Sequence, residues 1–129
     1  MRVLLADDSG LMLERLKEML HNYGQANIVG AVKNGIDTLE ALRTLKPDLA
    51  IVDLVMPGLS GLEVLSEIRK ENKTVKVIIL TFYSTDFYRQ KAIQAGADYF
   101  FNKVDDFEEV SMVVAGMLWK KENDHRMRS

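Results

Sequence analysis

Apolar and polar residues along the chain follow two kinds of spacing that alternate. Five short runs are almost wholly apolar and have the length of strands: residues 3–6, 28–32, 49–52, 77–80 and 99–101. Continuous apolar runs of this length are typical of strands covered on both faces, as in parallel sheets flanked by helices. The pattern therefore predicts five buried strands.

The segments after these runs repeat apolar residues every three or four positions, which indicates helices with one buried face. We expect helices at about residues 10–23, 34–46, 60–68, 84–96 and 105–121. Ser9 and Ser84 are placed to cap the first and fourth helices, and Pro47 and Gly96 to end the second and fourth. Ile36 belongs to the predicted buried face of the second helix.

Strict alternation of strands and helices predicts an α/β fold. We expect a five-stranded parallel sheet in the order 2-1-3-4-5 with five helices on both faces, as in flavodoxin-like proteins. These elements occupy residues 1–121 as one domain and leave residues 122–129 as a short charged tail. The first and third strands then lie side by side, and ligands are expected at their carboxyl ends.

The composition excludes several classes of function. The chain of 129 residues contains no cysteine, which excludes disulfides, thiolate metal sites and cysteine nucleophiles. The formal net charge of −2 comes from interspersed acids and bases, so there is no basic stripe for direct nucleic-acid binding. No apolar run reaches membrane-spanning length and no signal peptide precedes the first strand, so we expect a cytoplasmic protein outside the membrane.

Three acidic residues stand at the ends of two neighbouring strands of the predicted sheet. Asp7 and Asp8 follow the first strand, and Asp53 follows the third. At about 4 Å and an effective dielectric of about 20, each pair of charges costs on the order of 4 kcal/mol, so the cluster holds protons or a cation. Oxygen-only ligands favour Mg²⁺. Taken alone, Asp7 or Asp8 would be interpreted as a cap of the first helix.

Two further polar residues follow the fourth and fifth strands. Thr81 ends the fourth strand and offers a hydroxyl, and Lys103 follows the fifth within two residues. A lysine in this position is usually solvated, but an ammonium opposite carboxylates is suited to hold a phosphoryl oxygen. An acid nucleophile, a metal, a hydroxyl and a cation are the parts that phosphoryl transfer uses.

Several motifs, in order along residues 1 to about 120, carry a resemblance to a known family. They are Val-Leu-Leu-Ala-Asp-Asp-Ser at 3–9, Asn34-Gly35, Asp53-Leu-Val-Met-Pro-Gly, Thr81, Gly96-Ala97-Asp98 and Lys103. With this set at this spacing, the chain resembles the receiver domain of two-component response regulators, in its stand-alone, single-domain form. The resemblance implies a signalling switch that assists its own phosphorylation and dephosphorylation and is not a turnover enzyme.

For the acidic residues, the resemblance implies that Asp53 accepts a phosphoryl group from a histidine kinase or a histidine phosphotransfer protein. It also implies that Asp8 and Asp53 bind Mg²⁺ directly and that Asp7 acts mostly through water. The main-chain carbonyl of Val55 would complete the protein ligands of the metal.

For signalling, the resemblance implies that Thr81 and Lys103 hold the phosphoryl oxygens and that Phe100 is the switch aromatic, which turns inward behind Thr81. A downstream partner protein would read the face formed by the fourth helix, the fifth strand and the fifth helix. Met112 and Trp119 lie off the buried face of the fifth helix. We interpret them as a surface for a partner or a phosphorylation-dependent homodimer, or else expect Trp119 to fold over the end of the sheet.

Three features depart from the family's pattern. Val104 stands where proline usually follows the lysine, so we expect a trans or strained peptide bond there. Phe82 and Tyr83 stand where a small residue usually follows the threonine. With Val55 they are expected to crowd the phosphoryl group and slow its hydrolysis. Phe100 replaces the commoner tyrosine and offers no hydroxyl.

Three alternatives remain open. A degenerate receiver would bind partners without phosphorylation, and Val104 and Phe82 keep this alternative open. A phosphatase of the haloacid dehalogenase type also uses a strand-tip aspartate, but its two acids stand at alternate positions, whereas Asp7 and Asp8 are consecutive. A flavodoxin-like electron carrier needs a glycine-rich and hydroxyl-rich loop after the first strand, where these two acids would repel the flavin phosphate.

Overall fold

Five parallel strands form the centre of the computed structural model, which describes residues 1–128 and the side chains of residues 1–124. The strands are β1 (Arg2–Ala6), β2 (Asn27–Val32), β3 (Leu49–Val52), β4 (Lys76–Thr81) and β5 (Tyr99–Asn102). They pair in parallel in the order β2-β1-β3-β4-β5, which confirms the predicted sheet. Because all of them run in one direction, their carboxyl ends meet at one edge.

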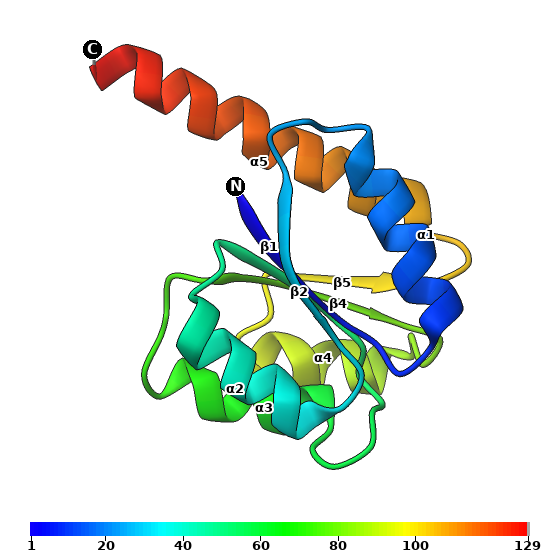
Figure 1. The fold of residues 1–129 in the computed structure, drawn as a ribbon. Helices are drawn as coiled ribbons and strands as arrows, with labels where there is room; N and C mark the ends of the chain where they lie inside the picture. Colours follow the sequence, from blue (N-terminus) through cyan, green and yellow to red (C-terminus); the bar gives the residue numbers. More distant parts are fainter. Residues whose placement is uncertain (129) are drawn as a thin grey trace.

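Helices alternate with the strands and cover both faces of the sheet (Figure 1). They are α1 (Gly10–His21), α2 (Gly35–Leu45), α3 (Gly61–Arg69), α4 (Asp86–Ala95) and α5 (Phe107–Arg128). Leu16 of α1 and Val114 of α5 belong to the buried cluster on one face. Leu42 of α2, Leu65 of α3 and Ala92 of α4 belong to the cluster on the other. The central strands are therefore buried on both faces, which explains their continuous apolar runs.

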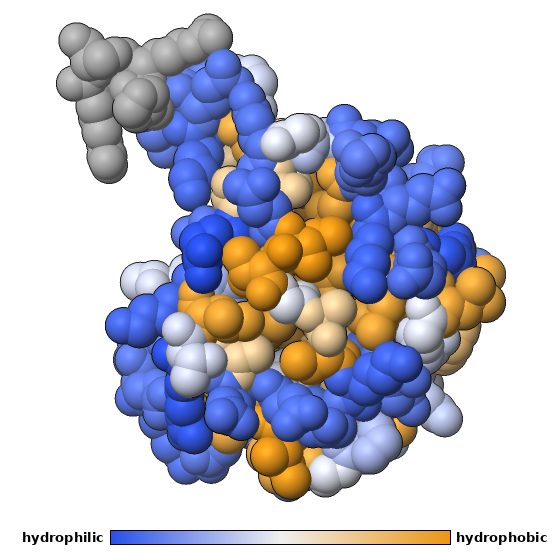
Figure 2. Space-filling view, viewed as in Figure 1, coloured by the Kyte–Doolittle hydropathy of each residue, from blue (hydrophilic) through white to orange (hydrophobic). Residues whose placement is uncertain are grey.

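β2 forms one edge of the sheet and is only partly covered. Its side chains are exposed or half-buried, whereas all four side chains of β3 are buried. Figure 2 shows apolar residues gathered in the middle of this face, where β2 lies in Figure 1, with hydrophilic residues over the surrounding helices. The predicted acidic residues follow the covered strands β1 and β3 and not this edge.

Polar side chains cap the helices at their amino ends. Ser9 caps α1 as predicted, because its hydroxyl accepts the amide of Met12 at 3.2 Å. The predicted cap of α4 is wrong by one residue. The helix begins after Thr85, whose hydroxyl accepts the amide of Tyr88, and Ser84 remains in the preceding loop.

Two other expectations about the helices are wrong. Ile36 is exposed, because the buried positions of α2 are Gly35, Thr38, Ala41 and Leu42, and residue 36 points away from that face. α5 does not end near Lys121 but continues to Arg128, since the charged residues there include no proline or glycine to stop it. Within residues 1–128, no helix has both the length and the apolar character needed to cross a membrane.

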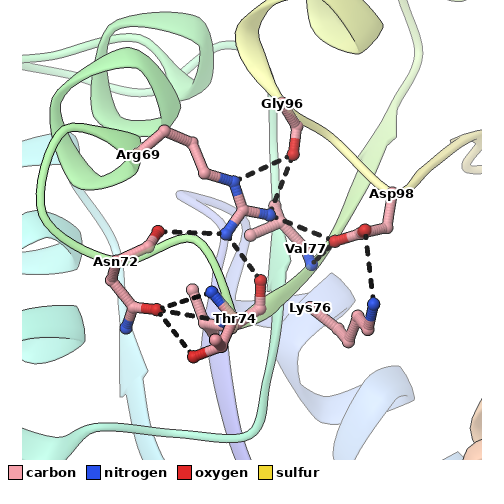
Figure 3. A network of polar contacts seen from close by, with 8 residues as sticks. Arg69, Asn72, Thr74, Lys76, Val77, Gly96 and Asp98 are labelled. Atoms are coloured by element: carbon pink, nitrogen blue, oxygen red, sulfur yellow. Dashed lines mark hydrogen bonds and ion pairs between the residues drawn. The ribbon is translucent and has the colours of Figure 1, made fainter.

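An arginine at the end of α3 ties together the amino ends of β4 and β5, at the edge of the sheet opposite to the acids (Figure 3). The guanidinium of Arg69 donates to the carbonyl of Gly96 at 3.0 and 2.8 Å. It also donates to the carbonyls of Asn72 and Val75 and pairs with Asp98 at 3.1 Å. Gly96 and Asp98, which belong to one of the motifs quoted above, therefore serve the fold.

Candidate functional site

β1 and β3 bring three carboxylates together at the carboxyl edge of the sheet. Ala6 pairs with Val52 in the sheet register, and the amide of Asp53 donates to the carbonyl of Ala6 at 2.8 Å. Asp7 and Asp53 are buried, whereas Asp8 is exposed. Each of these three acids offers a carboxylate oxygen within 4.8 Å of those of the other two. The predicted convergence of these acids is therefore present, and a cluster of oxygen donors alone fits a hard divalent cation such as Mg²⁺.

Lys103 lies between two of these carboxylates. Its ammonium is 2.7 Å from a carboxylate oxygen of Asp7 and 3.0 Å from one of Asp53. The lysine is only 2% exposed, and Asp7 and Asp53 are 2% and 6% exposed. The sequence predicted that Lys103 faces the acids, and the structure places it as the cation that offsets two buried negative charges.

The surroundings shift the pKa of Asp53 and of Lys103. Burial raises the pKa of Asp53 above its usual value, because water is withdrawn from its charged form, and Lys103 opposes this effect. For Lys103, burial acts to lower the pKa, but hydrogen bonds to Asp7 and Asp53 outweigh burial, so the pKa is raised. The lysine therefore stays charged and helps to keep Asp53 in the deprotonated form that a nucleophile needs.

Thr81 and Phe100 lie on the two neighbouring strands β4 and β5. The side chain of Thr81 is fully buried, and its hydroxyl accepts the amide of Tyr83 at 3.1 Å. Phe100 is buried too. The guanidinium of Arg89 in α4 donates to the backbone carbonyl of Phe100 at 3.1 Å and lies 5.0 Å from the centroid of its ring. The ring of Phe100 is therefore turned into the domain in this structure.

The loop after Asp53 packs closely against the starts of two helices. The amide of Val55 donates to the carboxylate of Asp53 at 3.4 Å, and the side chain of Val55 is exposed. A Cβ at Gly61 would overlap the carbonyl oxygen of Asp53, and one at Gly35 would overlap that of Leu59. The two glycines therefore let α2 and α3 approach this loop, which accounts for the Asn34-Gly35 motif.

The departures from the family pattern surround Lys103. The ring centroid of Phe82 lies 4.9 Å from the ammonium of Lys103, and Phe82 is itself 59% exposed, so the ring covers the lysine from the solvent side. Tyr83 and Val104 are also exposed. Among residues 1–128 no peptide bond is cis, so the bond between Lys103 and Val104 is trans, as the absence of proline indicated.

Comparison with known proteins decides the family. Residues 3–115 match the family model described as "Response regulator receiver domain". The chain belongs to this family. Receiver domains are signalling domains and generally not enzymes, so the phosphatase and electron-carrier alternatives are dropped.

The chain is similar to parts of longer curated proteins. The "Uncharacterized transcriptional regulatory protein YvfU" of Bacillus subtilis (strain 168) is 33% identical over 110 residues, which are 85% of this chain and 55% of that protein. The "Response regulator GacA" of Pseudomonas viridiflava is 30% identical over 122 residues, 92% of this chain and 57% of that protein. The receiver domain described here thus spans little more than half of these relatives.

A solved receiver domain supports the same assignment. The signal receiver domain of the putative response regulator NarL from Mycobacterium tuberculosis has a TM-score of 0.83 and 28% identity to this chain. The match covers 90% of this chain and 94% of that one. The receiver fold thus accounts for nearly all of the described residues.

Sequence reasoning missed the roles of two residues beside the site, Asn102 and Ser84. Asn102, directly before Lys103, makes three side-chain hydrogen bonds, one of them to Ser84. The signal that was available is the residue type, because asparagine before a loop often accepts backbone amides two or three residues ahead.

Proposed function

We propose that this receiver domain accepts a phosphoryl group on Asp53 from a histidine kinase or a histidine phosphotransfer protein. The observation that supports this best is the placement of Lys103 between Asp7 and Asp53, in a cluster of three carboxylates at the strand ends. A buried carboxylate with a lysine at 3.0 Å combines a nucleophile with a cation that is ready to hold phosphoryl oxygens.

In the proposed transfer, a carboxylate oxygen of Asp53 attacks the phosphorus of the donor's phosphohistidine. The new oxygen–phosphorus bond forms as the phosphorus–nitrogen bond breaks, and the imidazole leaves with the electron pair of that bond. Lys103 and the hydroxyl of Thr81 hold the phosphoryl oxygens. The domain also assists the later hydrolysis of this acyl phosphate, in which water attacks the phosphorus and Asp53 returns to a carboxylate, but it does not turn over a separate substrate.

The proposed metal is Mg²⁺, held by the carboxylates of Asp8 and Asp53 and the main-chain carbonyl of Val55, with Asp7 acting through water. When bound, Mg²⁺ supplies positive charge that offsets the negative charge of the acids and of the phosphoryl oxygens. Asp8 is the exposed member of the cluster, which fits a ligand that is reached from solvent. Asp7 is already engaged, since it accepts the amide of Ser9 at 2.9 Å and pairs with Lys103.

The proposed output passes from Thr81 and Phe100 to the face formed by α4, β5 and α5. Exposed apolar side chains on these elements support a partner surface: Phe87, Ile93, Tyr99, Met112 and Trp119. Trp119 is 70% exposed and does not fold over the sheet. We propose that a downstream protein or a second phosphorylated copy binds this face, that the domain acts in the cytoplasm, and that it makes no direct nucleic-acid contact. The transcriptional role in the name of YvfU refers to a protein that this chain only half spans.

The test is incubation of the protein with Mg²⁺ and acetyl phosphate, followed by intact-mass measurement. The proposal predicts the gain of one phosphoryl group, which requires Mg²⁺ and disappears in Asp53→Asn. Gel filtration of the same samples reports whether the phosphorylated form dimerises. A phosphoryl gain that persists in Asp53→Asn would contradict the assignment of the acceptor.

A second candidate is a receiver that binds partners without phosphorylation. The observation in its favour is the Phe82 ring over Lys103, which narrows access to the cation that phosphoryl oxygens would need. Under this alternative the mass of the protein does not change with acetyl phosphate or with any histidine-kinase donor, whereas partner binding is unaffected by Asp53→Asn.

A further inference from the structure

The two side chains proposed to hold phosphoryl oxygens stand at the starts of two different loops. Thr81 ends β4 and leads into the loop 82–85, and Lys103 follows β5 and leads into the loop 104–106. Thr81 pairs with Asn102 in the sheet register, and the amide of Lys103 donates to the carbonyl of Thr81 at 3.0 Å. Beyond this point the sheet pairing ends, so the relative position of the loops depends on other contacts.

Asn102 organises the loop that carries Lys103. Its side-chain oxygen accepts the amide of Val104 at 2.7 Å and that of Asp105 at 3.0 Å. The backbone amide of Asn102 donates to the carboxylate of Asp106 at 2.8 Å. Val104 has no ring to fix its backbone torsion, so these hydrogen bonds set the direction in which the chain leaves Lys103.

The remaining side-chain group of Asn102 connects this loop to the other one. Its side-chain nitrogen donates to the hydroxyl of Ser84 at 2.8 Å. Ser84 directly precedes Thr85, the cap of α4, and follows Phe82 and Tyr83 in the same loop. One asparagine thus fixes the turn after the lysine and joins it to the loop that follows the threonine.

We propose that Asn102 is a positioning residue for phosphoryl transfer, which through Ser84 ties the Thr81 loop to the Lys103 loop so that both side chains meet the same phosphoryl group. This inference rests on the proposed function and adds a role for two residues outside the acid cluster. None of the proposed metal ligands lies in these loops, although Lys103 contacts Asp7 and Asp53, so the link acts on the rate of transfer more than on the affinity for Mg²⁺.

The experiment compares Ser84→Ala and Asn102→Ala with wild type and with Asn72→Ala. Asn72 is a matched control, because its side-chain oxygen accepts the amides of Thr74 and Val75 in a similar turn at the opposite edge of the sheet (Figure 3). Two quantities are measured for each protein: the rate of phosphorylation by acetyl phosphate at saturating Mg²⁺, and the Kd for Mg²⁺ without phosphodonor. A third, the hydrogen exchange of the Val104 and Asp105 amides, is read by NMR and requires no phosphorylation.

We expect Ser84→Ala to slow phosphorylation roughly three- to tenfold, the range of one ordinary hydrogen bond, and Asn102→Ala to slow it further. The Kd for Mg²⁺ stays within about twofold of wild type in both variants, because no proposed metal ligand lies in these loops. The rate of transfer changes more, because it is sensitive to small errors in the position of the groups that hold the phosphoryl oxygens. Exchange at Val104 and Asp105 rises in Ser84→Ala although their acceptor is retained, because the link to the second loop is lost. Asn72→Ala leaves all three quantities unchanged.

Several results would overturn the inference. Phosphorylation of Ser84→Ala and Asn102→Ala at the wild-type rate removes the positioning role, and a parallel loss of Mg²⁺ affinity shows a general distortion of the site instead. Unchanged exchange in Ser84→Ala shows that the two loops are not coupled. A wild-type protein that gains no phosphoryl group refutes the proposed function, and with it the role in transfer, whatever the exchange data show.

Discussion

Replacing Lys103 with methionine removes the cation that two buried carboxylates share. Methionine keeps a similar length and apolar stem, so the change is mainly one of charge. The two carboxylates stay where they are, 2% and 6% exposed, with oxygens within 4.8 Å of each other. Like charges at that distance repel by about 3.5 kcal/mol at an effective dielectric of about 20. Removing one partner of a buried ion pair typically costs about 3–5 kcal/mol, and we expect Lys103→Met to lower the free energy of unfolding by that amount at pH 7.5 without Mg²⁺.

The loss should depend on pH with a definite sign. Burial already raises the pKa of Asp53 in the folded protein, and without Lys103 the pKa rises further above the unfolded value. A raised folded pKa means that the folded state binds the extra proton, so stability is retained at low pH and lost as pH rises through that pKa. The difference between wild type and Lys103→Met should therefore shrink between pH 7.5 and pH 5.5. Mg²⁺ at one hundred times its Kd for Lys103→Met should raise the free energy of unfolding of that variant by about 2.7 kcal/mol.

Urea unfolding measures these free energies of unfolding. Far-UV circular dichroism is the suitable probe, because Trp119 is exposed and its fluorescence would report unfolding poorly. Lys121→Met is the matched control. Lys121 pairs with Asp48 at 3.2 Å, but the two side chains are 58% and 44% exposed, so its removal should cost about 0.2–1 kcal/mol. A loss below 1 kcal/mol in Lys103→Met, or an equal loss at both pH values, would refute the view that Lys103 offsets buried charge.

Three further predictions concern other parts of the domain. Phe82→Ala should shorten the lifetime of the phosphoryl group on Asp53 by roughly two- to fivefold, because the ring over Lys103 no longer hinders the water that attacks this group. Phe87→Ala, which removes a similarly exposed ring, should leave the lifetime unchanged. Equal lifetimes of phosphorylated wild type and Phe82→Ala, followed by mass spectrometry, would contradict this. Gly61→Ala should cost about 1–3 kcal/mol in urea unfolding and reduce phosphorylation, since the new methyl overlaps the Asp53 carbonyl; wild-type behaviour in both assays would show that the loop adapts. Arg69→Met should lower the free energy of unfolding by about 2–4 kcal/mol, because several carbonyl oxygens lose their donor; a loss under 1 kcal/mol would mean that water replaces the guanidinium.

The convergence of the acids and Lys103 could be predicted because it follows from the order of the strands. Parallel strands place all their carboxyl ends at one edge, and β1 and β3 are neighbours in the sheet, so Asp7 and Asp53 must lie close together once the order is known. Lys103 follows β5, which β4 separates from β3, so the strand order places it at the same edge, and its long side chain then reaches Asp7 and Asp53 at 2.7 and 3.0 Å. The roles of these residues in chemistry came from the family resemblance and stay proposals.

Features that depend on loop conformation could not be predicted. Ser84 and Thr85 are adjacent and both residue types cap helices, and only the path of the chain after β4 decides that Thr85 caps α4 while Ser84 accepts a hydrogen bond from Asn102. The contact of Phe82 with Lys103 joins residues on two loops, and apolar spacing carries no information on it. The pattern predicts an end of α5 near Lys121 because the apolar positions stop there and charged residues follow, but the chain contains no stop signal and the helix continues to Arg128.

The central claim is that Asp53, and neither of the other two acids in the cluster, accepts the phosphoryl group. Treatment with Mg²⁺ and acetyl phosphate, followed by peptide mapping of the acyl phosphate, measures this directly. The account predicts one phosphoryl group per chain, located on Asp53 and released by hydroxylamine. A phosphoryl group on Asp7 or Asp8, or none on a folded protein that binds Mg²⁺, would contradict it.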